Sequence, residues 1–268
     1  MTFRHAMCNE AFAAWPFAAA CRAIHGAGYT GIEIAPFTLS DDPVRIPVER
    51  RRELRDTMAS EGLTFAGLHW LMVAPRGLHL TTPDAALRRR SWDHLRGLAD
   101  LCADLGPRGV MVLGSPGQRG TTGGLTPPEA KRHLMEGLAD LAPHAAERGV
   151  AVLLEALPAS QCDVVRTLGE AAAIGPTLFD VHNAIDEREP HAALVERHFD
   201  MIRHVHLNEL DGRHCGAGAY DYKPVLEALA RRGYTGWLSL EAFDFTPGPE
   251  RIAEESLRHI ESEIAGIS

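Results

Sequence analysis

The sequence predicts an α/β fold built as a single closed (β/α)₈ barrel. Eight apolar, strand-like segments alternate with eight amphipathic, helix-like segments, and a helix–glycine–strand phrase occurs near both ends of the chain. The length of 268 residues also matches the roughly 250 residues usual for eight such units. The main alternative is an open doubly wound sheet. No GxGxxG turn follows the first strand, which disfavours a dinucleotide-binding fold, and we expect no nucleotide cofactor.

The repeated phrase is GYTGIEIAPF at 28–37 and GYTGWLSLEAF at 233–243. Each copy follows an amphipathic stretch that has the pattern of a helix. Glycine commonly ends a helix, and the apolar run after it is typical of a buried strand. The same unit at both ends indicates that one architecture runs through the whole chain.

Apolar runs bounded by turn residues give the expected strands, which in order are 5–12, 31–37, 64–72, 109–115, 149–157, 176–183, 202–210 and 236–243. Amphipathic stretches give the expected helices, which are 17–27, 48–61, 84–105, 128–147, 166–173, 190–200, 222–232 and 249–264. The segment SPGQRGTTGGLTPP at 115–128 is expected to be a long loop over the barrel mouth and a candidate lid. No low-complexity linker divides the chain, so 1–268 is expected to form one TIM barrel domain.

Composition and charge disfavour a nucleic-acid-binding protein, a disulfide-rich protein and a membrane protein. A net charge of −9 disfavours a nucleic-acid partner, because phosphate binding usually requires a basic excess. Five cysteines are scattered without CxxC spacing, which favours reduced thiols and a cytoplasmic location. No apolar run approaches the roughly 20 residues that cross a bilayer, and the N-terminus lacks the pattern of a signal peptide, so no membrane partner is expected.

Four consecutive strands, from the fifth to the eighth, each carry one polar side chain near the carboxyl end. These are Glu155, Asp180, His206 and Glu241. Each is expected on the inward face of its strand, opposite to the face whose aliphatic residues contact the helices. Catalytic groups of such barrels lie at this end. Clustered carboxylates repel one another unless a cation lies between them. Oxygen-rich ligation with one imidazole suits Mn²⁺, with Co²⁺ or Mg²⁺ as alternatives.

Other polar residues near strand ends have more ordinary interpretations. His204 lies one layer deeper than His206 and is expected to be a hydrogen-bonded core histidine that supports the metal ligand. Glu33 is expected to form a salt bridge or to contact substrate. His69 lies at an inward position near a strand end and could position a substrate hydroxyl. Arg119, on the candidate lid, is expected to be a solvated loop arginine, with a phosphate clamp as the alternative.

The stretches LLEAL, FDVHN, HVHLNE, GAGAYDYKPVLEAL and GYTGWLSLEAF resemble the xylose isomerase-like TIM barrel superfamily over essentially the whole chain. The resemblance is to its sugar phosphate isomerase/epimerase branch, which includes ketose 3-epimerases and hydroxypyruvate isomerase. It implies one Mn²⁺ or Co²⁺ held by Glu155, Asp180, His206 and Glu241, with the two glutamates exchanging the substrate proton. Homo-oligomers are common in this family.

The resemblance also suggests substrate contacts. His182 lies two residues after Asp180, where the family has a histidine three residues after its aspartate, and it is expected to contact substrate oxygen atoms. Arg213 corresponds to the family's arginine after the metal histidine, with a shift of one residue. Gln161 stands where the epimerases carry a second acid, which disfavours strict ketose 3-epimerase activity.

The expected activity is therefore that of a metal-dependent isomerase or epimerase acting on a ketose or related keto-sugar through an enediolate. The same residues could serve a lyase or dehydratase if a leaving group lies beta to the carbonyl. A remote alternative is a DNA-repair enzyme of the endonuclease IV type. It is disfavoured by the acidic net charge and by Gly114 and Ser115, which end the fourth strand without a metal ligand.

Overall fold

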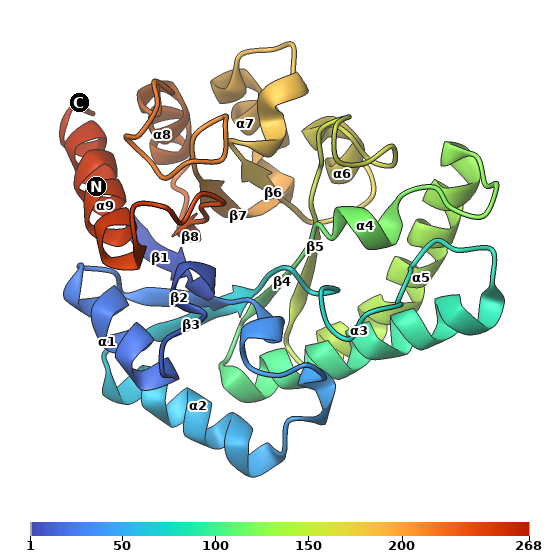
Figure 1. The fold of residues 1–268 in the computed structure, drawn as a ribbon. Coiled ribbons are helices and arrows are strands. Elements are labelled where there is room, and N and C mark those ends of the chain that lie inside the picture. The colour runs from blue at the N-terminus through green and yellow to red at the C-terminus, as the bar shows by residue number, and fades with distance from the viewer. Residues whose placement is uncertain (1, 268) are drawn as a thin grey trace.

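The structure is a computed structural model that describes residues 2–267. Eight parallel strands pair in chain order into a closed barrel, and β8 returns to pair with β1 (Figure 1). The strands are β1 Arg4–Cys8, β2 Gly31–Ile34, β3 Thr64–Leu68, β4 Val110–Leu113, β5 Ala151–Leu154, β6 Thr177–Asp180, β7 Ile202–Leu207 and β8 Trp237–Leu240. The predicted (β/α)₈ barrel is confirmed.

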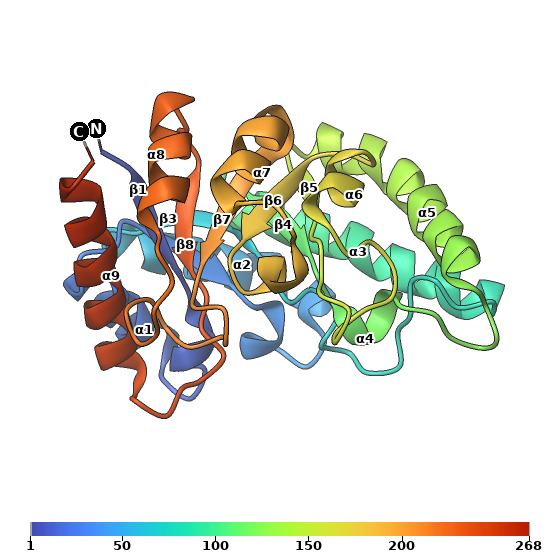
Figure 2. The same ribbon diagram turned by 90° about the horizontal axis from the view of Figure 1, so that it is seen from above.

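Helices surround the strands and cover their outer faces. They are α1 Phe17–Gly26, α2 Val48–Ser60, α3 Ala85–Leu105, α4 Pro116–Arg119, α5 Pro127–Glu147, α6 Leu168–Ala172, α7 His191–His198, α8 Lys223–Arg231 and α9 Pro249–Ala265. Helix α9 lies beside both α1 and α8, so the last helix completes the outer ring (Figure 2). Within residues 2–267, the structure has no helix long and apolar enough to cross a membrane.

Local sequence explains where the two longest helices begin. The Asp84 side chain accepts hydrogen bonds from the first free backbone N–H groups of α3. Thr126 and Glu129 form a reciprocal capping box at the start of α5, where Pro127 takes the first helical position. Both helices then bury an apolar face against the barrel.

The inward-facing side chains of the strands change from apolar to polar along the barrel axis. Val110, Val112, Leu153 and Leu178 form a small apolar cluster of their own. Two residues further along, β5 and β6 lead to Glu155 and Asp180. In the β6–β7 register, Asp180 lies opposite His206. The strand ends therefore deliver polar groups to one end of a packed interior.

The observed strands are shorter than the expected ones, mainly at their carboxyl ends. The expected strands 149–157 and 236–243 end as β5 at Leu154 and as β8 at Leu240. Glu155 and Glu241 thus begin the loops that follow. The segment 115–128 is also more ordered than expected, because α4 forms within it.

Candidate metal centre and pocket

The four residues predicted to share a cation come together at the carboxyl ends of β5 to β8. Their ligand atoms lie within 4.8 Å of one another, and all four residues are buried. From Nδ1 of His206, the distance is 3.7 Å to Glu155 Oε1, 3.4 Å to Asp180 Oδ2 and 3.0 Å to Glu241 Oε2. One imidazole nitrogen therefore faces three carboxylates.

Glu33 orients this imidazole from the opposite side of the barrel. His206 Nε2 donates to the Glu33 carboxylate at 3.2 Å, and His204 Nε2 donates to it at 2.7 Å. A ring that donates through Nε2 leaves the Nδ1 lone pair for a metal ion. His204 is thus a hydrogen-bonded core residue, and Glu33 holds the rings of both histidines in place.

The electrostatics of the cluster fit a divalent cation. His206 Nδ1 and Glu155 Oε1 are buried and have no hydrogen-bond partner within residues 2–267. Burial, together with repulsion from Asp180 and Glu241, raises the pKa of Glu155 to about 7. Burial likewise raises the pKa of Glu241. A cation between these groups would satisfy the orphaned atoms and offset the repulsion.

Asn208, which sequence reasoning did not single out, supports Asp180. Its side-chain amide donates to Asp180 Oδ2 at 3.3 Å, and its oxygen accepts the backbone N–H of His182 at 2.7 Å. The other Asp180 oxygen accepts the backbone N–H of Asn183 at 2.8 Å. The sequence signal for Asn208 was its position in the pair Asn208–Glu209, directly after β7. Without the fold, this pair could not be distinguished from ordinary loop residues.

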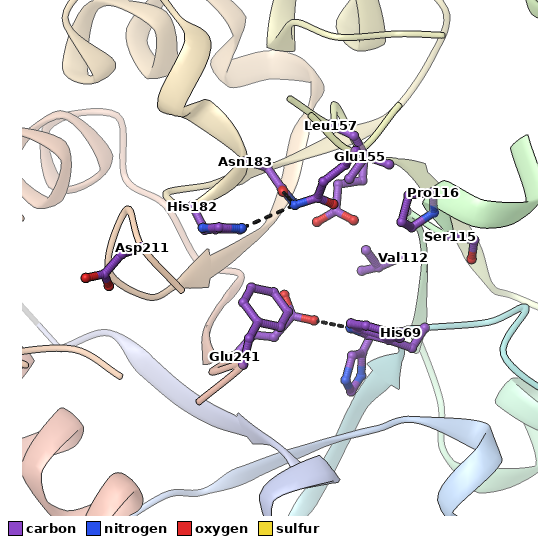
Figure 3. A pocket seen from close by; sticks show the side chains of 14 residues that line it. His69, Val112, Ser115, Pro116, Glu155, Leu157, His182, Asn183, Asp211 and Glu241 are labelled. Atoms are coloured by element: carbon purple, nitrogen blue, oxygen red, sulfur yellow. Dashed lines mark hydrogen bonds between the residues drawn. The ribbon is translucent and has the colours of Figure 1, made fainter. Parts of the chain in front are cut away.

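A cavity of about 410 Å³ lies over the cluster. Glu155 and Glu241 border it from different sides, whereas Asp180 and His206 are not among its lining residues (Figure 3). Three further predicted residues, His69, Gln161 and His182, also line it. This is the pocket expected at the carboxyl end of a barrel, largely apolar with a few polar groups in its wall.

His182 and Gln161 form one hydrogen-bonded unit in this wall. His182 Nδ1 donates to the Leu210 carbonyl at 2.8 Å, which leaves Nε2 as an acceptor for Gln161 Nε2 at 3.2 Å. The Gln161 amide also donates to Asn183 Oδ1 at 3.3 Å. The two side chains therefore hold each other at the cavity surface, where they can meet substrate oxygen atoms.

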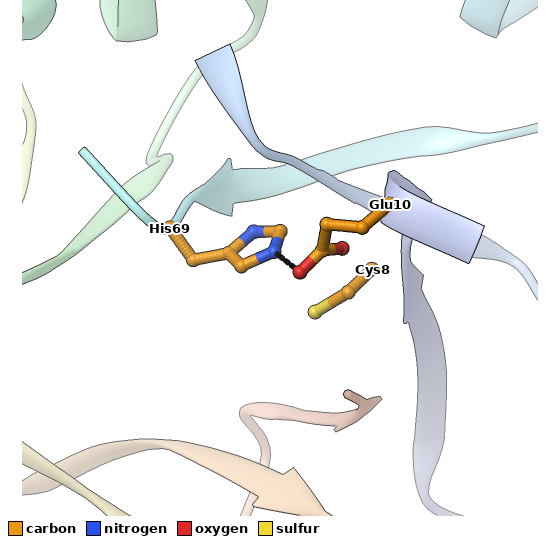
Figure 4. A group of neighbouring side chains, drawn as sticks. All are labelled: Cys8, Glu10 and His69. Carbon is orange, nitrogen blue, oxygen red and sulfur yellow. Dashed lines mark ion pairs between the residues drawn. The ribbon is translucent and has the colours of Figure 1, made fainter. Parts of the chain in front are cut away.

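His69, predicted to position a substrate hydroxyl, lines the cavity and also lies near two protein carboxylates. Its Nε2 lies 2.5 Å from Glu10 Oε1 (Figure 4). Its Nδ1 lies 3.7 Å from Glu33 Oε1. Burial alone would lower its pKa, but the Glu10 carboxylate outweighs burial and raises the pKa to about 9. Both ring nitrogens are thus directed at protein carboxylates, and the charge of the ring is balanced within the wall.

Among the residues that the structure describes, two other groups could offer ligand atoms to a metal, and both contain Cys8. They are Cys8–Glu10–His69 and Cys8–Glu33–His206. Burial raises the pKa of the Cys8 thiol well above its ordinary value. A protonated thiol is a poor ligand. The cluster of three carboxylates and one imidazole is therefore the better cation site.

The two candidate arginines lie outside the cavity lining. Arg213 pairs with Asp211 at 2.8 Å and its side chain is 43% exposed, while Asp211 itself borders the cavity. The expectation of a solvated Arg119 is wrong, because its side chain is completely buried. The backbone around it is tied inward, since the Gln118 carbonyl accepts the Leu80 N–H at 2.7 Å.

Trp70, which was not among the predicted site residues, contacts Glu241 and lines the cavity. Its Nε1–H donates to Glu241 Oε1 at 2.7 Å, while Glu241 Oε2 faces His206. Its φ of 51° lies in the left-handed region, which is rare for a bulky residue and often marks a functional constraint. Glu241 is therefore held in one orientation from the loop that follows β3.

Replacing Trp70 by phenylalanine should lower kcat about 10- to 100-fold, because the lost hydrogen bond to a charged group is worth roughly 1.5–3 kcal/mol. The retained aromatic ring should keep KM within about 3-fold of its original value. Steady-state kinetics separate the two parameters, and Trp15→Phe, at a half-exposed tryptophan elsewhere, is the matched control. An unchanged kcat in Trp70→Phe would show that the bond does not position Glu241.

Gly114, at the end of β4, makes room for the Glu155 carboxylate. A Cβ at this position would lie only 2.0 Å from Glu155 Oε2. Gly114→Ala should therefore displace the carboxylate and weaken Mn²⁺ binding about 10-fold or more in a calorimetric titration. Gly117→Ala is the control, since a Cβ there has no atom within 4 Å. Equal affinities of the two variants would contradict this packing argument.

Comparison with known proteins agrees with this architecture. The sequence model of the family described as "Xylose isomerase-like TIM barrel" matches residues 21–263. A putative hydroxypyruvate isomerase of Streptomyces coelicolor is 27% identical over 85% of each chain. An inosose dehydratase of Geobacillus thermodenitrificans is 30% identical over 87 residues, a match that spans 24% of this chain and 29% of that protein.

Among solved structures, a 3-keto-D-glucoside 4-epimerase from E. coli superposes with a TM-score of 0.83 at 18% identity, over 97% of this chain and all of that one. A D-psicose 3-epimerase superposes with a TM-score of 0.82 at 16% identity, over 98% and 97% of the two chains. At these identities the superpositions show a shared fold. Because the family match covers nearly the whole barrel, the chain belongs to the xylose isomerase-like TIM barrel family.

Proposed function

We propose that the protein is a divalent-metal-dependent sugar isomerase or epimerase. One observation carries the proposal. Of the four residues in the cation cluster, only Glu155 and Glu241 also line the cavity. A substrate over the cluster would therefore meet two carboxylates from different sides, the arrangement needed to remove a proton and return it elsewhere.

The four residues of the cluster would hold one cation, for which Mn²⁺ is our first choice and Co²⁺ or Mg²⁺ the alternatives. A bound cation would polarise the substrate carbonyl and lower the free energy of enolate formation. Glu155 or Glu241 removes the proton alpha to the carbonyl and the other returns a proton, through an enediolate.

The remaining candidate residues have supporting roles in this proposal. His182 and Gln161 bind substrate oxygen atoms through their polar atoms at the cavity wall. His69 contributes a fixed, internally balanced charge rather than a hydrogen bond to substrate. Arg213 acts only through Asp211, whose carboxylate it holds at the cavity edge.

A lyase or dehydratase is the second candidate. It is favoured by the partial match to an inosose dehydratase and by Gln161 in place of the second acid of the ketose 3-epimerases. In this reaction, the enolate formed by loss of the alpha proton would expel a leaving group from the beta carbon. Proton removal by the glutamate pair is common to both candidates, and the product distinguishes them.

Proton–deuterium exchange tests the proposed function. The full chain, loaded with Mn²⁺, would be incubated in D₂O with a panel of ketoses, keto acids and ring ketones, and deuterium incorporation would be followed by mass spectrometry. We expect exchange with at least one compound, and its loss when a chelator removes the ion. No metal-dependent exchange with any member of the panel would overturn the proposal.

A further inference from the structure

We infer that the substrate is an uncharged keto-sugar whose ring stays closed, either a keto-glycoside or a cyclic polyol ketone, rather than a sugar phosphate or a keto acid. The inference rests on the proposed function, since it concerns what the same pocket accepts. Three properties of the pocket carry it, namely its charge, its aromatic wall and its size.

The pocket has no cationic side chain available to an anionic substrate. No arginine or lysine in residues 2–267 lines the cavity. Arg119 is completely buried and is not a lining residue, and Arg213 is paired with Asp211. The two ring nitrogens of His69, which lines the cavity, lie near the carboxylates of Glu10 and Glu33. A phosphate or carboxylate group would therefore lie in the pocket without an arginine or lysine partner.

The cluster itself adds negative charge. When ionised, its three carboxylates together carry one more negative charge than a divalent cation neutralises. Glu155, Glu241 and Asp211 also border the cavity. An anionic group that lost its water here would be repelled as well as unpaired. Hydroxyl groups suit this wall better, because they can donate hydrogen bonds to the lining carboxylates.

An aromatic surface forms part of the cavity wall. Trp70 and Phe243 line the cavity, with ring centroids 6.2 Å apart, and remain 39% and 37% exposed. Exposed aromatic side chains that lie together mark a binding surface. The negative face of an aromatic ring attracts the C–H groups on the flat face of a closed sugar ring. An open-chain ketose offers no such face. The left-handed backbone conformation of Trp70 is energetically costly, which supports a functional reason for holding its ring in the cavity wall.

The cavity volume agrees with a ring substrate. At about 410 Å³, the cavity corresponds to the liquid volume of roughly fourteen water molecules. That space accommodates a six-membered ring with its hydroxyl groups and a small substituent. A three-carbon keto acid would leave most of it filled with water.

The test compares matched compounds in the exchange assay with the Mn²⁺-loaded full chain. The panel would contain methyl 3-keto-glucopyranoside, its 6-phosphate, a keto-inositol, D-fructose and hydroxypyruvate. We expect metal-dependent exchange at least 10-fold faster with one or both uncharged ring ketones than with the other three compounds. Comparing the glycoside with the keto-inositol identifies which ring type is preferred, and loss of water from either would mark the lyase reaction.

Each other outcome overturns a separate statement. Equal or faster exchange with the 6-phosphate or hydroxypyruvate would overturn the assignment of an uncharged substrate and leave the proposed function standing. Fastest exchange with D-fructose would overturn the closed ring in the same way. No exchange with any compound would instead overturn the proposed function.

A pair of variants tests the aromatic wall directly. Phe243→Ala should raise KM for the preferred ring ketone about 10-fold, since it removes half of the aromatic surface. Phe245→Ala, two residues along the same loop, is the control, because Phe245 is similarly exposed at 42% but is not a lining residue. Equal KM values for the two variants would contradict ring stacking on Phe243.

Discussion

Replacing Glu241 by glutamine should reduce metal-dependent proton exchange by about 10²- to 10⁴-fold, the range that a positioned acid or base contributes. Glutamine keeps the shape of the side chain and can still accept the Trp70 N–H, but it cannot carry the proton. Glu155→Gln should have an effect of similar size, because the two residues share the task. Exchange into substrate, measured at saturating Mn²⁺ for each variant, gives the comparison.

Glu250→Gln is the control for this pair, since Glu250 is exposed on the first turn of α9. Metal content should be measured in every variant by elemental analysis, so that loss of the ion is not mistaken for loss of the base. If a fully metal-loaded Glu241→Gln variant exchanges protons within a few-fold of the original rate, the assignment of the proton-carrying pair is wrong.

Metal binding should stabilise the folded protein strongly. A ligand present at 100 times its Kd stabilises the native state by about 2.7 kcal/mol, and we expect a corresponding rise in Tm when Mn²⁺ is added. His206→Ala should weaken Mn²⁺ binding about 100-fold or more and abolish this rise, because it removes the only nitrogen ligand of the cluster. Thermal unfolding with and without Mn²⁺ measures both effects.

Cys8→Ser is the matched control for this experiment. Cys8 belongs to both other groups of metal-competent side chains but not to the four-residue cluster. The Cys8→Ser variant should keep the full Mn²⁺-dependent rise in Tm. If it loses the rise while His206→Ala retains it, the ion binds at a Cys8 group and the assigned centre is wrong.

The barrel could be predicted because its signals are local. Alternation of apolar runs with amphipathic stretches and the repeated glycine phrase each involve residues close in sequence. The cation cluster could also be predicted, because the parity of a strand fixes which side chains point inward. Asp180, for example, lies opposite His206 in the β6–β7 register.

Contacts across the barrel could not be predicted from such patterns. The bond between Trp70 and Glu241 joins residues 171 positions apart, as does the bond between Glu33 and His204. Neither pair shares a strand or a neighbouring register. Burial of Arg119 was also missed, because glycine-rich and proline-rich composition indicates a loop without showing that the loop folds inward.

Crystallisation with Mn²⁺ and anomalous diffraction would test the metal centre most directly. We predict one strong anomalous peak per chain, within about 2.0–2.3 Å of His206 Nδ1 and of an oxygen from each of Glu155, Asp180 and Glu241. This range is close to the bond lengths known for divalent ions with these ligand types. A peak beside Cys8, or no peak among these four side chains in crystals that contain Mn²⁺, would contradict it.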